Sequence, residues 1–104
     1  MKIEKWNEAD GPLSESLLRR KLETRGYIVH RYTYPPGTYF PEHTHGIDKI
    51  DAVLSGRFRM VVEGRAVILE AGDCISVPRG TAHSAEVVSQ DSVVSLDATR
   101  IEQE

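Results

Sequence analysis

The sequence predicts an all-β domain preceded by one short helix. From residue 27 onward, short segments rich in Val, Ile, Tyr and Phe alternate with turn signals formed by Gly, Pro and Asp. This regular spacing of short apolar segments and turns is typical of a β-sandwich or β-barrel. The strands expected on this basis cover residues 27–34, 50–54, 58–62, 66–69, 74–77, 82–88 and 93–96, the last extending slightly further.

The first 26 residues have a different residue pattern from the rest of the chain. Ser14 is a suitable N-cap and Gly26 a suitable stop for a helix. A chain of 104 residues forms one domain. We therefore expect an arm and a short helix in residues 1–26, packed on a barrel formed by residues 27–104. The leucines that would face the barrel recur at helical spacing: Leu13, Leu17, Leu18 and Leu22.

Composition excludes several functional classes. The net charge is −3 and the charged residues form no basic stripe, so we expect no nucleic-acid partner. No apolar run approaches the length of a membrane span, so no membrane partner is expected. A lone Cys74 cannot form an intramolecular disulfide, and the N-terminus lacks the apolar stretch of a signal peptide. We expect a cytoplasmic protein in which Cys74 is a buried small hydrophobe.

Three of the four histidines indicate a metal site. His43 and His45 are two positions apart, so both imidazoles project to the same side of an extended segment. His83 follows a Pro-Arg-Gly turn, and a closed barrel can bring it opposite that pair. His30 lies inside an expected strand. It is interpreted as a solvent-facing or hydrogen-bonded histidine, with an additional ligand as the alternative.

The two histidine segments resemble the motifs of the cupin superfamily. Residues 37–45 match its first motif, a Gly, five residues and then His-x-His. The second motif is a Gly, five residues, Pro-x-Gly, two residues and a His, with an Asn three residues further on. Val87 stands where the Asn is usual. The matching positions of the second motif are Gly72, Pro78, Gly80 and His83.

This resemblance implies a jelly-roll barrel, also called a double-stranded β-helix, with a metal held by His43, His45 and His83. A three-histidine site is similar to that of thiol dioxygenases and some other cupin oxygenases, which use iron. The ligand set also permits Ni, Zn, Mn or Cu. Cupin barrels commonly pair, so the resemblance also implies a homodimer.

The sequence departs from the family at the acidic ligand. The motif spacing places Lys49 where cupins carry a Glu, and an ammonium cannot bind a metal. Three interpretations remain open. Lys49 is paired with Asp51, leaving a neutral three-histidine site; Asp51 or Asp48 supplies the missing carboxylate; or the site has lost its metal and binds an organic ligand. Lys49 and Asp51 are the expected catalytic residues, orienting a substrate or moving a proton.

Further pocket residues are expected from the strand pattern. Arg57 and Arg59 alternate with an apolar pair, Phe58 and Met60, so either pair can face inward. Inward arginines would bind an anionic substrate; a solvated face is the alternative. Tyr39 is expected to join the arginines in the substrate pocket. Aromatic residues at the barrel mouth or in its core are expected at Tyr32, Tyr34, Tyr39 and Phe40.

Two functions from different classes follow. The first is a metal-dependent enzyme, with an oxygenase as the leading class, that acts on a small polar or anionic molecule at the three-histidine site. The second is a non-catalytic small-molecule or metal-binding sensor. The fold does not choose between them, because one fold hosts many chemistries.

Overall fold

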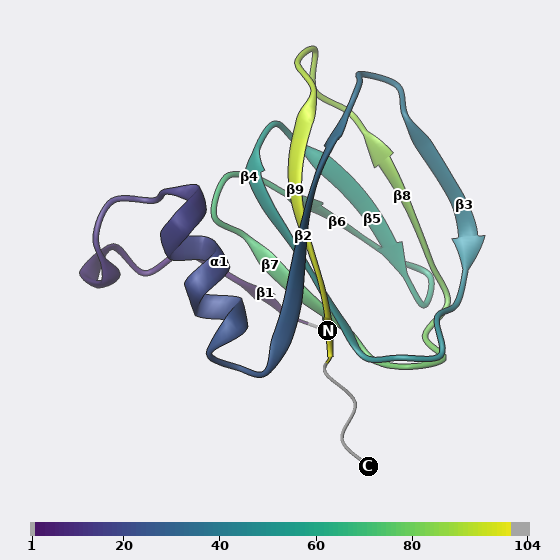
Figure 1. The fold of residues 1–104 in the computed structure, drawn as a ribbon. Coiled ribbons are helices and arrows are strands. Elements are labelled where there is room, and N and C mark those ends of the chain that lie inside the picture. The colour runs from purple at the N-terminus through teal and green to yellow at the C-terminus, as the bar shows by residue number, and fades with distance from the viewer. Residues whose placement is uncertain (1, 101–104) are drawn as a thin grey trace.

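A computed structural model of the chain describes residues 2–100 and contains two antiparallel sheets that face each other (Figure 1). One sheet has five strands and the other has four. The expectation of an all-β jelly roll with one short helix is confirmed. The five-stranded sheet has the order β1 (Ile3–Glu4), β7 (Cys74–Val77), β4 (Lys49–Ser55), β9 (Val93–Arg100) and β2 (Tyr27–Tyr34). The four-stranded sheet has the order β3 (Tyr39–His43), β8 (His83–Val87), β5 (Phe58–Val62) and β6 (Arg65–Leu69).

The helix α1 (Glu15–Glu23) covers the outer face of the five-stranded sheet, next to β2 (Figure 1). It begins where the sequence predicts, because the Ser14 hydroxyl accepts a hydrogen bond from the Leu17 amide at 3.2 Å. Leu18 and Leu22 are completely buried against the sheet. Burying each leucine contributes roughly 2 kcal/mol to stability. Within the described residues, no helix is long and apolar enough to cross a membrane.

The N-terminal arm is attached to the barrel by a strand that the sequence pattern does not predict. β1 pairs with β7, with Ile3 opposite Ile75. The Glu4 carboxylate lies 2.7 Å from the Lys21 ammonium and 2.6 Å from the Arg25 guanidinium. These cations hold the pKa of Glu4 down at about 2. A short 3₁₀ helix (Glu8–Asp10) then leads to α1.

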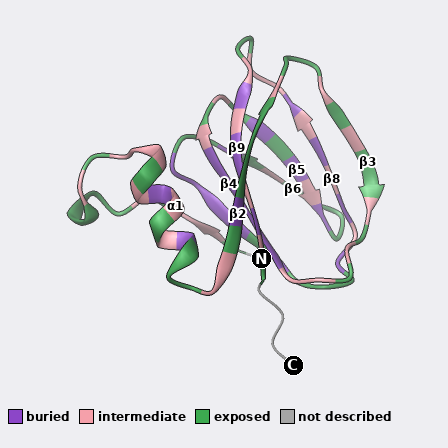
Figure 2. Cartoon of the chain, viewed as in Figure 1, coloured by how far each residue is buried: buried purple, intermediate pink, exposed green. Residues whose placement is uncertain are grey.

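In the four-stranded sheet, β5 and β8 alternate between buried and more exposed residues, as a sheet with one covered face requires (Figure 2). Their buried side chains meet those of β4, β7 and β9 to form a core between the sheets. A second core lies between α1 and the five-stranded sheet, and Cys74 belongs to it. Burial raises the pKa of the Cys74 thiol, so the expectation of a buried small hydrophobe is confirmed.

Gly56 fixes the tight connection between β4 and β5. Its φ of 85° lies in the left-handed region that side-chain-bearing residues rarely adopt. A Cβ at this position would lie 2.6 Å from the Ser92 carbonyl oxygen. This turn keeps β4 and β5 in opposite sheets, so their inward residues face each other across the barrel.

Candidate metal centre

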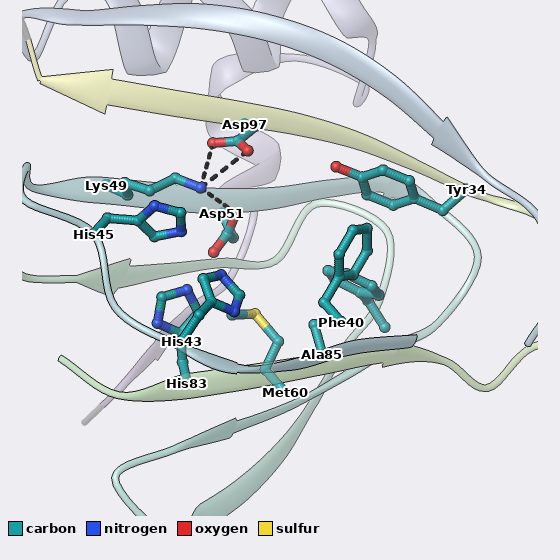
Figure 3. A pocket seen from close by; sticks show the side chains of 11 residues that line it. Tyr34, Phe40, His43, His45, Lys49, Asp51, Met60, His83, Ala85 and Asp97 are labelled. Carbon is teal, nitrogen blue, oxygen red and sulfur yellow. Dashed lines mark hydrogen bonds and ion pairs between the residues drawn. The ribbon is translucent and has the colours of Figure 1, made fainter. Parts of the chain in front are cut away.

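Three histidines meet between the sheets, as the motif spacing predicts. His43 ends β3, His45 lies two residues further on, and His83 begins β8, where it is directly opposite His43. Their ring centroids are 4.3 to 5.1 Å apart, and one ligand nitrogen from each ring lies within 4.8 Å of the others. Figure 3 shows the rings gathered at one end of a pocket.

Hydrogen bonds orient two of these rings. Nδ1 of His43 is 2.6 Å from the Pro41 carbonyl oxygen, and Nδ1 of His83 is 2.8 Å from the Thr81 carbonyl oxygen. A carbonyl oxygen only accepts, so each Nδ1 carries the proton and donates it. In a neutral imidazole the lone pair is then on Nε2, the atom available to a metal. This backbone support for a ligand histidine is the arrangement usual in metal sites.

The surroundings of His45 and His83 favour the neutral imidazole. Burial lowers the pKa of His45, and the nearby Lys49 ammonium lowers it further. Burial also lowers the pKa of His83, although its hydrogen bond to Thr81 acts in the opposite direction. A metal binds only the unprotonated imidazole. The three histidines therefore fit a divalent transition metal.

Lys49 lies in the same pocket, at the position where the sequence motif lacks its Glu. Its ammonium is 2.9 and 3.0 Å from the two carboxylate oxygens of Asp97, on the neighbouring strand β9. The contact with Oδ2 is a hydrogen bond; Oδ1 is buried and makes the ion pair without hydrogen-bond geometry. Asp51 is further away, with its Oδ1 3.9 Å from the ammonium. The main partner of Lys49 is thus Asp97, which the sequence analysis missed.

Asp51 is the second carboxylate of this group. It lies two residues from Lys49 on β4 and directly opposite Asp97 on β9. Burial raises the pKa of Asp51 to about 6; Asp97 acts in the same direction and Lys49 in the opposite one. The third acidic residue considered, Asp48, lies outside the pocket-lining residues, and its carboxylate accepts a hydrogen bond from the Arg79 amide at 2.8 Å. The Asp48 carboxylate therefore makes a loop contact outside the pocket.

The pocket has a volume of about 160 Å³ and two chemically different sides. The polar side carries three histidines, two carboxylates and one ammonium. The other side, on which Figure 3 shows Tyr34 and Phe40, is largely apolar. The aromatic rings of this side contact one another, with Tyr34 and Phe40 centroids 4.9 Å apart. The residues of the apolar side are Tyr34, Phe40, Phe58, Met60 and Ala85.

The structure corrects the expectation of further pocket residues. Tyr39, Arg57 and Arg59 are exposed and do not line the pocket. Strand alternation is the reason: when Phe40 on β3 and the apolar pair on β5 fill the interior, their neighbours must point outward. Among the described residues, therefore, no arginine lines this pocket to bind an anionic substrate.

His30 and Tyr32, for which the sequence allowed more than one position, both lie toward solvent. His30 is exposed and is not part of the histidine cluster. Tyr32 is 45% exposed on the same strand, β2, at the edge of the five-stranded sheet. Of the four aromatic residues considered for the barrel mouth, Tyr34 and Phe40 line the pocket.

Comparison with protein families agrees with this architecture. The family model of the cupin domain matches residues 30–99, which include all three clustered histidines and both aspartates of the pocket. The chain belongs to the cupin family.

Among curated proteins, this cupin is 42% identical over 62 residues to an acireductone dioxygenase from Gluconacetobacter diazotrophicus. The match covers 56% of the chain but only 35% of that relative. It is also 33% identical over 58 residues to an uncharacterized protein from Sinorhizobium fredii, of which 27% is covered. The chain therefore matches about a third or less of the curated relatives' lengths.

Solved cupin structures have the same fold. KdgF from a Halomonas species superposes with a TM-score of 0.65 at 25% identity, covering 75% of this chain and 72% of that one. A predicted oxalate decarboxylase from Thermotoga maritima superposes with a TM-score of 0.67 at 24% identity, covering 80% and 74%. These similarities establish the barrel and leave the reaction open.

Proposed function

We propose that this cupin is a metal-dependent enzyme that acts on a small polar molecule, with His43, His45 and His83 as the metal ligands. The observation that carries the proposal is the convergence of three imidazoles whose backbone hydrogen bonds leave Nε2 free on two of them. A divalent Fe, Ni, Zn, Mn or Cu ion suits these ligands. When bound, such an ion supplies a Lewis acid with open coordination positions.

Oxygenase chemistry is the most specific form of this proposal. Its support is the similarity to a curated acireductone dioxygenase, which extends over little more than half of the chain. The three neutral ligands also leave the charge of a dication uncompensated, which suits oxygen-donor ligands. In this proposal Asp51 accepts a proton from the substrate, because its raised pKa of about 6 lies close to neutral pH.

Lys49 has a supporting part in the proposed reaction. Its ammonium compensates the charges of Asp51 and Asp97 and orients their carboxylates toward the pocket. Because the carboxylates of Asp51 and Asp97 both attract the Lys49 ammonium, the ammonium is held in the pocket. The expectations of a homodimer and of a cytoplasmic location remain predictions.

Metal analysis tests the proposal. The protein is purified without chelator, reconstituted anaerobically with Fe²⁺ and separately with Ni²⁺, Zn²⁺, Mn²⁺ and Cu²⁺, and analysed for bound metal. We expect about one metal ion per chain for at least one of these ions, and its loss in His83→Ala. The matched control is His30→Ala, which removes an exposed histidine outside the cluster. Oxygen consumption during a small-molecule screen then reports the reaction class. No metal uptake by the wild-type protein would contradict the proposal.

A non-catalytic sensor is the second candidate. The observation that favours it is Lys49, whose positive charge replaces a carboxylate ligand and opposes a dication in the same pocket. A thermal-shift screen followed by turnover assays separates the two candidates. Ligands that stabilise the metal-loaded protein without being converted favour the sensor.

A further inference from the structure

The pocket contains two carboxylates whose acceptor capacity the described residues leave partly unused: Asp97, whose buried Oδ1 has no hydrogen-bond partner, and Asp51. The Asp51 side chain is 9% exposed and lines the pocket. Among the described residues no group donates a hydrogen bond to its carboxylate, and the Lys49 ammonium approaches only to 3.9 Å. Buried carboxylates normally accept hydrogen bonds, because an ionised group left without a partner costs several kcal/mol. Figure 3 shows this carboxylate turned toward the space above the histidines.

The charge balance around Asp51 indicates what kind of partner fits. Two carboxylates and one ammonium line the pocket, and the ammonium is held at 2.9 to 3.0 Å by Asp97. The arginines nearest in sequence, Arg57 and Arg59, are exposed on the outside of the barrel. Without a bound metal, an anionic group placed beside Asp51 would therefore meet a negative charge, and the described pocket lining holds no free cation to offset it.

The size and the opposite side of the pocket limit the ligand further. A cavity of roughly 150 Å³ holds one benzene molecule, and this pocket measures about 160 Å³. The apolar side is formed by aromatic and aliphatic groups, including Phe40, Phe58 and Met60. A small ligand can place an apolar part here while its polar end reaches Asp51.

From these features we propose that the metal-free pocket selects a small ligand that is not negatively charged, has an apolar part, and donates a hydrogen bond from a hydroxyl or amino group to Asp51. The inference goes beyond the proposed function, since it concerns the metal-free state of the same pocket; a bound dication would offset the negative charges. It depends on the protein's own residues and does not require a bound metal. The metal and the ligand preference can therefore be tested separately.

The test uses metal-free protein, so that a carboxylate probe cannot bind to a metal. Single-ring probes of similar size are titrated into ¹⁵N-labelled protein and followed by NMR: benzyl alcohol, benzylamine and benzoate. We expect benzyl alcohol and benzylamine to bind at least about ten-fold more tightly than benzoate, with shifts at pocket residues. A ten-fold difference corresponds to about 1.4 kcal/mol.

Asp51→Asn tests the role of the carboxylate directly. The amide that replaces the carboxylate can still accept a hydrogen bond but carries no charge, so we expect benzylamine to lose about ten-fold in affinity and benzoate to gain. Asp91→Asn, which changes an exposed aspartate outside the pocket, is the matched control and should leave all three affinities unchanged. If Asp51→Asn does not fold, the three probes on the wild-type protein still decide.

Two results would overturn the inference. One is benzoate binding to the wild-type protein as tightly as the donor probes; the other is an unchanged preference in folded Asp51→Asn. Metal uptake combined with either result would remove this inference and leave the proposed function standing. A preference for the donor probes without metal uptake would support this inference and contradict the proposed function.

Discussion

The Lys49 ammonium on β4 lies 2.9 and 3.0 Å from the two carboxylate oxygens of Asp97 on β9. The strands are adjacent, and Lys49 is diagonal to Asp97 because Asp51 is the residue directly opposite. The Lys49 side chain is 8% exposed and that of Asp97 21%, so this ion pair is largely but not fully buried. The cation at the position where the cupin motif has a carboxylate therefore finds its partner on the next strand.

Lys49→Met should destabilise the metal-free protein by roughly 3 kcal/mol or more at neutral pH. The reason is that the buried Asp51 and the partly buried Asp97 would be left without their cation. Urea denaturation followed by circular dichroism measures this change. Lys2→Met, at an exposed lysine, should alter stability by less than about 0.5 kcal/mol. Equal stabilities of the two variants would show that the ion pair does not hold the pocket together.

Lys49→Glu should strengthen metal binding, because it restores a carboxylate where the family motif has one. The same change should destabilise the metal-free protein, since three carboxylates would then share one pocket. Calorimetric titration with the metal that the wild type binds should show at least about ten-fold tighter binding. Unchanged or weaker binding would mean that position 49 does not face the metal.

Glu4→Gln should weaken the attachment of the N-terminal arm in a pH-dependent way. The folded-state pKa of Glu4 is lowered to about 2 from 4.5, mainly by its hydrogen bond to Arg25. A lowered pKa stabilises the fold above the unfolded-state value, and this contribution disappears as the pH falls from about 4.5 to about 2. Glu4 is partly exposed, so the loss at pH 7 should be no more than about 1 kcal/mol.

Urea denaturation at several pH values checks this prediction. The wild type and Glu4→Gln should differ at pH 7 and converge as the pH approaches about 2. Glu23→Gln, at an exposed glutamate of α1, is the control. A difference that persists unchanged at the acid end would contradict the ion-pair explanation.

Gly56→Ala should destabilise the barrel by roughly 2 kcal/mol or more. The new Cβ would add a clash with the Ser92 carbonyl oxygen to the strain of a positive φ. Gly37→Ala is a matched control, because Gly37 has a φ of 80° and a Cβ added there would meet no atom within 4 Å. It should cost about 1 kcal/mol. Thermal unfolding of both variants measures the difference, and similar losses would show that the close approach to Ser92 is unimportant.

The sequence predicted the histidine cluster because each of its two motifs has a local spacing that resembles the cupin pattern. His43 and His45 are two positions apart on one segment, and the Pro and Gly that precede His83 predict the turn before it. The strands were predictable for a similar reason, since alternation and turn residues act over a few positions. These local features need no knowledge of which strands pair, whereas the meeting of His83 with His43 depends on the pairing of β3 with β8, which the resemblance to cupins implied.

Asp97 could not be predicted in this way. The apolar pattern of the last strand ends near Leu96, whereas the observed strand continues to Arg100 and places Asp97 opposite Asp51. This relation depends on the pairing of β4 with β9, which one sequence does not reveal. The outward position of Arg57 and Arg59 could have been predicted from the sequence, because burying Phe58 and Met60 removes more apolar surface from water.

An anomalous-scattering map of crystals soaked in the metal that the protein takes up would test the central claim most directly. Data collected on both sides of the absorption edge locate the ion and identify the element. The account predicts a single strong peak within about 2.1 Å of ligand nitrogens from His43, His45 and His83, with Lys49 still on Asp97. A pocket without a peak, or a peak held by other residues, would contradict it.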